Sequence, residues 1–223
     1  IPTGLPTVDT RIHGWQRGEL IGLLSYMGVG KTWLLLYFGA CAWKSGYKVL
    51  FVTPELERHL AEFRIDSLIG GFSNQALVSG DVDSLPLDSY KKYLTMLSQD
   101  QHWLTYDAVR DDILSGQGIV GLIGSHRPDL VLVDGLHLII EAENERLTSW
   151  EKIKRVSRLL KIAAVKHQCA IIVVNQANMH DEVIRNRQLA FAKMPSPQDS
   201  YYGRAFPHDC DVVITMCNDP DNP

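Results

Sequence analysis

The sequence lacks the features that mark secreted and membrane-spanning proteins. It has no apolar run approaching the ~20 residues that a membrane helix needs, and its four cysteines form no Cys-x-x-Cys pair. These absences predict free thiols in a reducing, cytoplasmic compartment and no membrane partner. The chain also begins with Ile1 rather than Met and has no signal-peptide layout, so we expect it to be a fragment of a longer protein.

A strong charge of one sign is missing too. The 22 Lys and Arg residues face 26 Asp and Glu residues, which leaves a formal net charge of −4. A monomer with this balance should not hold nucleic acid through bulk electrostatics, although local contacts within an assembled ring remain open. With 223 residues, 45% of them hydrophobic, the chain suits a single globular domain over residues 1–223.

Short apolar runs alternate with helical patterns along most of the chain. Strands are expected at 20–24, 48–53, 103–106, 130–134, 170–174 and 211–216. Helices are expected at 31–44, 55–69, 89–97, 111–123 and 150–167. Continuous apolar strands are typical of a sheet that is covered on both faces. The pattern therefore predicts an α/β fold with a mostly parallel central sheet and helices on both faces.

The run Ser-Tyr-Met-Gly-Val-Gly-Lys-Thr at 25–32 stands between an expected strand and an expected helix. Its turn and helix N-terminus would present backbone N–H groups to an anion, and the helix dipole favours negative charge there. Serine replaces the first glycine of the strict phosphate-loop pattern, and an ordinary glycine-rich turn is the alternative. Lys-Thr in this context favours a nucleotide site formed by Ser25, Met27, Gly28, Val29, Gly30, Lys31, Thr32 and Trp33.

Three further polar side chains follow expected strands, where ligands of parallel sheets bind. Asp134 would hold Mg²⁺ beside Thr32, although a helix cap or a salt bridge would also suit it. Glu55 would be the base that accepts a proton from water; Glu57 is a rival, and both would also suit a helix start. Gln176 would contact the terminal phosphate, or would simply be a polar strand end.

The segment 178–204 is polar and contains proline, which predicts a long loop. Its basic residues, together with two tyrosines, could contact a phosphate backbone and stack on bases. The candidate DNA contacts are Arg185, Arg187 and Arg204. Composition alone favours an ordinary solvated loop.

These motifs together resemble the motor domain of DnaB-like hexameric replicative helicases, a branch of the RecA-like P-loop NTPases. Residues 3–9 and 14–20 are similar to the lead-in to that family's phosphate loop, whose first glycine is often absent. Residues 51–57 resemble the segment with the family's catalytic glutamate, and the match falls on Glu55 rather than on Glu57.

The later motifs extend the resemblance along nearly the whole chain. Residues 131–139 resemble the Walker B segment, with His137 in place of the usual glutamine. Residues 173–176 resemble the segment with the γ-phosphate-sensing glutamine. Residues 202–213 resemble the family's last motif, whose upstream loop touches single-stranded DNA; Arg204 stands where small residues are common.

The resemblance implies an ATP hydrolase that uses Mg²⁺ to move a hexameric ring along single-stranded DNA during replication. Lys31, Glu55 and Gln176 would be the catalytic residues, and Thr32 and Asp134 would hold the metal. Further partners would be a primase or a helicase loader. The protein would then work at the nucleoid or replication fork, or in the host cytoplasm if a phage or plasmid encodes it.

Two parts of the resembled family have no counterpart in the sequence. The amino-terminal collar domain is missing, and the strand with the arginine finger would lie past Pro223. We therefore expect residues 1–223 alone to bind nucleotide but to hydrolyse it slowly. The alternatives are a RecA-, RadA- or KaiC-like ATPase, and a helicase-derived regulatory or loader module that binds nucleotide.

Overall fold

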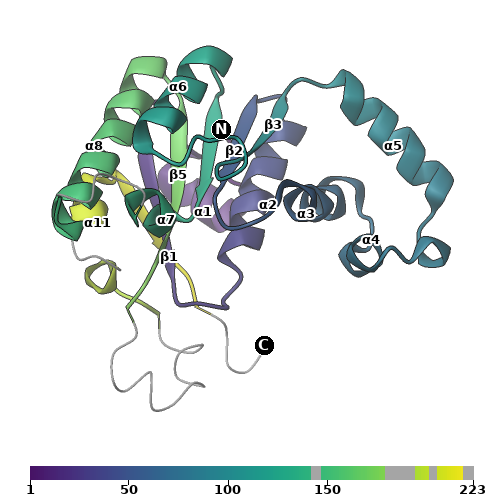
Figure 1. The fold of residues 1–223 in the computed structure, drawn as a ribbon, viewed down its shortest axis with the longest axis horizontal. Helices are drawn as coiled ribbons and strands as arrows, with labels where there is room; N and C mark the ends of the chain where they lie inside the picture. Colours follow the sequence, from purple (N-terminus) through teal and green to yellow (C-terminus); the bar gives the residue numbers. More distant parts are fainter. Residues whose placement is uncertain (142–146, 179–193, 201–204, 218–223) are drawn as a thin grey trace, which may run out of the picture.

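The computed structural model describes residues 1–141, 147–178, 194–200 and 205–217. Its centre is a six-stranded sheet in the order β3-β2-β4-β5-β1-β6, with every pair of neighbours parallel (Figure 1). The predicted parallel α/β architecture is therefore confirmed. The strands are β1 (Leu20–Ser25), β2 (Val49–Thr53), β3 (Trp103–Asp107), β4 (Leu130–Asp134), β5 (Ala170–Gln176) and β6 (Val212–Thr215).

Helices connect these strands and cover both faces of the sheet (Figure 1). The α-helices of the described ranges are α1 (Pro6–Ile12), α2 (Lys31–Lys44), α3 (Arg58–Gly70), α4 (Asn74–Ser79), α5 (Leu87–Gln99), α6 (Gly116–His126), α7 (Leu136–Glu141), α8 (Ser149–His167) and α11 (Ala205–Asp209). Two 3-10 turns, η1 (Val82–Ser84) and η2 (Pro197–Asp199), complete the set. None of these helices has the length and apolar character required to cross a bilayer.

Alternate residues of each central strand enter two separate hydrophobic cores, because successive side chains of a strand point to opposite faces. In β4, Leu130 and Leu132 pack with α2 and α3, whereas Val131 and Val133 pack with α6, α7, α8 and α11. All five residues of β4 are buried. The strand is thus apolar on both faces up to its last residue, Asp134, which the two helix layers leave at the rim of the sheet.

The starts of two helices differ from the sequence prediction by three residues or more, and side chains explain why. α3 begins at Arg58 rather than at 55, because residues 54–57 form a turn in which the Thr53 hydroxyl accepts the Leu56 N–H at 2.9 Å. α6 begins at Gly116 rather than at 111. There the Ser115 hydroxyl caps the helix by accepting the Gly118 N–H at 3.0 Å, as serine commonly does.

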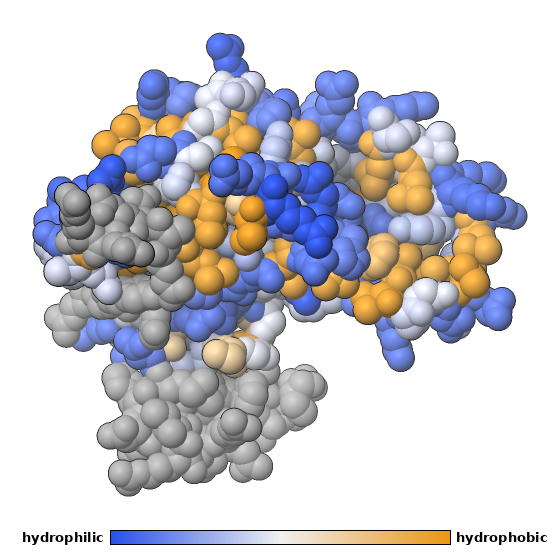
Figure 2. Space-filling model, in the orientation of Figure 1, coloured by the Kyte–Doolittle hydropathy of each residue, from blue (hydrophilic) through white to orange (hydrophobic). Residues whose placement is uncertain are grey.

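Helices α4 and α5, with the 3-10 turn η1 between them, form an arm beside the edge strand β3, away from the phosphate-loop end of β1 (Figure 1). The sequence predicted only α5 in this region. The arm exposes several large apolar side chains, and Figure 2 shows hydrophobic surface over it. They are Val78, Val82, Leu87, Leu94 and Met96.

Candidate active site

The phosphate loop runs from the end of β1 to the first residue of α2. Gly28 and Gly30 have φ angles of 83° and 95°, a left-handed conformation that glycine adopts without strain. A Cβ on either residue would meet no atom within 4 Å, so backbone conformation rather than space requires glycine there. At the position of the missing first glycine, Ser25 is buried and its hydroxyl donates to the Tyr26 carbonyl at 2.9 Å. The loop therefore forms with serine in that place.

Lys31 opens α2 and folds back over the loop. Its Nζ donates to the Tyr26 carbonyl at 2.8 Å, so the ammonium group lies across the mouth of the turn. Burial lowers its pKa, while the carboxylates of Glu55 and Asp134 act in the opposite direction. A cation between two acidic groups and the free N–H groups of a helix N-terminus makes a site suited to a polyphosphate.

Thr32 and Asp134 meet although 102 positions separate them in the sequence. The Thr32 hydroxyl donates to Asp134 Oδ2 at 2.8 Å. Asp134 is fully buried, and its second oxygen, Oδ1, has no hydrogen-bond partner among the described residues. Burial and the nearby Glu55 raise the pKa of Asp134 to about 6. A buried carboxylate oxygen without a partner next to a hydroxyl is a donor set that fits Mg²⁺, a cation that prefers oxygen ligands.

Glu55 reaches the same site from the turn after β2. Its Oε1 lies 3.4 Å from His137 Nε2, and burial raises the pKa of the Glu55 carboxyl. Gly135, at φ 110°, makes this position possible, because a Cβ there would lie only 2.8 Å from Glu55 Oε1. The rival Glu57 pairs instead with Arg110 at 2.9 Å, and it is Glu55 whose charge acts on Lys31 and Asp134. The geometry therefore places Glu55, and not Glu57, beside the phosphate loop.

Gln176 is the last residue of β5 and lies opposite Ser25 in the register of the parallel pair. Its backbone N–H bonds to Asn175 Oδ1 at 3.0 Å, and the buried Asn175 amide donates to Ser200 Oγ at 2.8 Å. The half-buried Gln176 side chain thus starts beside the beginning of the phosphate loop. It is fixed at its base by a network that the sequence did not indicate.

The flanking residues predicted to bind nucleotide fall into two groups. Val29 is buried in a small cluster with Leu24 and Tyr26, so its side chain supports the loop and only its backbone can face a ligand. Met27 and Trp33 are exposed, at 65% and 36%.

Sequence reasoning did not single out two neighbours of the site, Gly135 and Arg64. The Arg64 guanidinium lies over the Trp33 ring, 5.3 Å from its centroid. Its charge slightly opposes the rise in the pKa of Asp134. A glycine directly after the strand-end aspartate was the available signal for Gly135. A single arginine in a helical pattern carries no comparable signal.

The predicted DNA contacts Arg185, Arg187 and Arg204 lie outside the described residues. Within the described part of the chain, no group of three or more His, Cys, Asp or Glu residues could hold a metal by itself.

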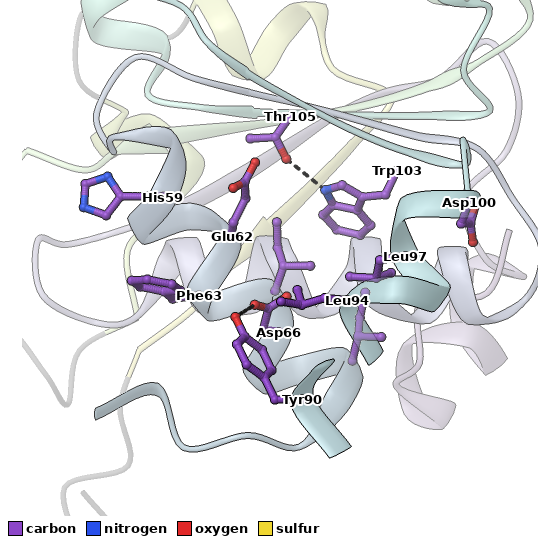
Figure 3. Close-up of a pocket in the computed structure, with 12 residues that line it drawn as sticks. His59, Glu62, Phe63, Asp66, Tyr90, Leu94, Leu97, Asp100, Trp103 and Thr105 are labelled. Carbon is purple, nitrogen blue, oxygen red and sulfur yellow. Dashed lines mark hydrogen bonds between the residues drawn. The ribbon is translucent and has the colours of Figure 1, made fainter. Parts of the chain in front are cut away.

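A separate cavity of about 270 Å³ lies between α3, α5 and β3 (Figure 3). Its wall is mostly apolar, and Asp66 inside it accepts a hydrogen bond from the Tyr90 hydroxyl at 2.7 Å. Burial raises the pKa of Asp66, and this carboxyl ties α5 to α3. We interpret the cavity as a gap in the interface where the arm packs against α3 and β3, distinct from the phosphate loop.

The all-parallel sheet and the phosphate loop between β1 and α2 define the RecA-like P-loop NTPase fold. Within that class, the chain belongs to the family of the DnaB-like helicase C terminal domain, whose profile matches residues 1–219. It is 24% identical to the replicative DNA helicase DnaB of Leifsonia xyli subsp. xyli over 236 residues. That match covers 97% of this chain and 46% of the relative, so the chain spans about half of the relative's length.

Solved structures share the fold. One of them, an ATPase domain, superposes with a TM-score of 0.80 at 17% identity, over 96% of this chain and 74% of that one. A DnaB-like replicative helicase, described with its interactions with primase, gives the same TM-score and identity. That likeness covers 96% of this chain and 50% of the other.

Proposed function

We propose that this chain is the ATP-driven motor domain of a hexameric DNA helicase that acts in replication. The observation that carries the proposal is the meeting of Thr32, Asp134, Lys31 and Glu55 at one end of the sheet, in a chain of the DnaB-like family. Each of these side chains has a charge or hydrogen-bonding group that suits nucleotide hydrolysis. The ligand would be ATP with Mg²⁺, and the reaction would be transfer of the γ-phosphoryl group to water.

The residues have separate roles in this proposal. Lys31 and the N–H groups of the loop bind the β- and γ-phosphates, and Gln176 contacts the γ-phosphate. Thr32 and Asp134 hold Mg²⁺, which when bound neutralises charge on the phosphate oxygens. Glu55 orients the attacking water and accepts its proton as the bond between the γ-phosphorus and the bridging oxygen breaks. Its raised pKa suits a group that must take up a proton near neutral pH.

Single-stranded DNA, other copies of the chain in a ring, and a primase or helicase loader are the proposed partners. Family membership supports the first two, and a structural relative described with its interactions with primase supports the third. The site of action would be the replication fork in the cytoplasm, or in the host cytoplasm for a phage-encoded protein.

ATPase and strand-separation assays on the full-length protein test the proposal. We expect single-stranded DNA to stimulate turnover and Lys31→Ala to abolish nucleotide binding or hydrolysis, because it removes the cation that faces the phosphates. Lys44→Ala, at the far end of the same helix, is the matched control and should leave turnover unchanged. Full activity of the Lys31→Ala protein would refute the assignment.

The same assays separate the alternatives. Membership of the DnaB-like family favours a helicase over a recombinase or a clock-type ATPase. A regulatory or loader module of the same descent would bind nucleotide without DNA-stimulated turnover or strand separation. That result would favour the regulatory or loader module over the helicase motor.

A further inference from the structure

Helix α8 concentrates positive charge on an otherwise acidic molecule. Its 19 residues include six of the chain's 22 Lys and Arg residues and one of its 26 acidic residues. The one acid, Glu151, is already engaged, since it accepts the N–H and the hydroxyl of Thr148, each at 2.8 Å, in a capping box. No other acid within the helix is present to neutralise its cations.

A groove of about 300 Å³ lies between this helix and α11. Its lining residues are Trp150, Lys154, Arg158, Ala205, His208 and Asp209. Trp150 is 52% exposed, and the Lys154 ammonium lies over its ring, 4.5 Å from the centroid. The groove thus combines a half-exposed indole, which has the Lys154 ammonium over one face, with positive charge at its edge.

The fold leaves two cations of the groove available. Asp209 accepts a hydrogen bond from the Ser157 hydroxyl, which ties this carboxylate to α8. Lys161, further along the helix, is bound by Asp211 at 2.6 Å and has a structural role. Within the described ranges, Lys154 and Arg158 have no carboxylate partner, so their donors are available to an anionic ligand.

We propose that this groove binds single-stranded DNA, with phosphates on Lys154 and Arg158 and a base stacked on Trp150. The inference rests on the proposed function and adds a contact site to it. An unpaired base can stack on an exposed indole whereas a paired one cannot, and basic residues beside an aromatic ring are typical of single-strand sites. In the sequence, the lining residue Ala205 directly follows Arg204, one of the predicted DNA contacts.

Binding of a labelled oligothymidine to the full-length protein, with a slowly hydrolysed ATP analogue, tests the charged contacts. Replacing Lys154 and Arg158 together by Gln should weaken binding and flatten the salt dependence, because fewer phosphates are neutralised. The log–log slope should fall by about 0.7 for each phosphate that the variant no longer binds. The control replaces Lys91 and Lys92 on α5 by Gln; both are exposed, and this change should leave affinity and slope unchanged.

The aromatic contact has its own test. Trp150→Ala should lower affinity about tenfold, whereas Trp150→Phe should keep most of it, because a phenyl ring still stacks on a base. An abasic oligonucleotide should bind the wild type and Trp150→Ala equally. Duplex DNA of the same length should bind more weakly than the single strand.

The outcomes distinguish the groove from the motor. If the wild type binds DNA and the groove variants bind it with the same affinity and slope, the groove inference fails and the proposed function stands. If the wild type does not bind DNA, both fail. Loss of ring assembly in the Gln double variant, measured by light scattering, would also overturn the inference by making the groove a contact between subunits.

Discussion

Asp134, the proposed metal ligand, lowers the stability of the metal-free fold when it is ionised. Its buried carboxylate has a pKa of about 6, against an ordinary value of 3.8, so the folded protein binds this proton more tightly than the unfolded chain does. The resulting stabilisation is present below about pH 4 and is lost as the pH rises through about 6. At roughly 1.4 kcal/mol per pKa unit, the ionised side chain costs the metal-free fold up to about 3 kcal/mol.

Asp134→Asn should therefore raise the melting temperature of the metal-free protein at about pH 8, and raise it much less at about pH 4.5. The asparagine oxygen can still accept the Thr32 hydroxyl, so the packing is preserved. Thermal unfolding in EDTA at both pH values measures the difference. Added Mg²⁺ and nucleotide should stabilise the wild type more than the variant. A variant that is less stable than the wild type at the higher pH would contradict the assignment of Asp134 as a charge held ready for a cation.

Gly135 offers a second test at the level of one residue. An alanine there would be strained at φ 110°, and its Cβ would displace Glu55, whose Oε1 would lie 2.8 Å away. We expect Gly135→Ala to lower kcat strongly while nucleotide affinity, which depends on Lys31 and the loop, is kept. Steady-state ATPase and nucleotide-binding measurements on the full-length protein separate the two effects.

Gly46→Ala provides the control for backbone strain. Gly46 also has a positive φ, 83°, but a Cβ there meets no atom within 4 Å. This substitution should cost about 1–3 kcal/mol of stability and leave kcat unchanged. Equal losses of kcat in both variants would mean that strain, and not the position of Glu55, explains the effect.

Single residues also mark the limit of what sequence reasoning can find. Glu55, Asp134 and Gln176 could be predicted from the sequence because each stands at or just after the end of a buried strand. Parallel strands bring their carboxyl ends to one edge of the sheet. The approach of Arg64 to Trp33 depends on how α3 packs against α2, which no local pattern records.

At the scale of elements, the packing of α2 on the sheet positions the phosphate loop, since that helix begins at Lys31. Gly39 is a point of close approach: a Cβ there would lie 2.6 Å from Leu132 Cδ1 and 2.7 Å from the Trp103 ring. Gly39→Ala should therefore push α2 outward and cost about 1–3 kcal/mol, through overpacking. Denaturant unfolding measures this cost.

Gly121 supplies the opposite case on α6. It is exposed, and a Cβ there meets no atom within 4 Å. Gly121→Ala should stabilise the protein by up to about 1 kcal/mol, because alanine has the higher helix propensity. If both substitutions destabilised the protein equally, close packing at Gly39 would not be the reason.

Helices and strands could be predicted where the apolar pattern runs over many residues. Their ends could be predicted where a nearby side chain caps them. α2 and β4 have the predicted bounds, and α8 begins one residue earlier, at Ser149, after the cap Thr148. The short helices α4 and α7 were missed, because six residues hold too few turns for a period to show.

At the scale of the whole molecule, the proposed ring should make activity depend on assembly. If a neighbouring subunit supplies the arginine finger, ATP turnover per subunit should rise with protein concentration until rings form, by as much as several orders of magnitude. ATPase assays across a dilution series, with light scattering to follow assembly, measure this dependence. Constant turnover per subunit through the dissociation range would show that each subunit acts alone.

The position of β1 has a consequence for the synthesis of the protein. This fully buried strand carries the phosphate loop, yet its sheet neighbours are β5 and β6, which leave the ribosome much later. During translation, the apolar segment Leu20–Ser25 therefore has no strand partner until β5 has been synthesised. Until β5 and β6 emerge, this apolar segment is exposed to aggregation and is a site that chaperones can bind.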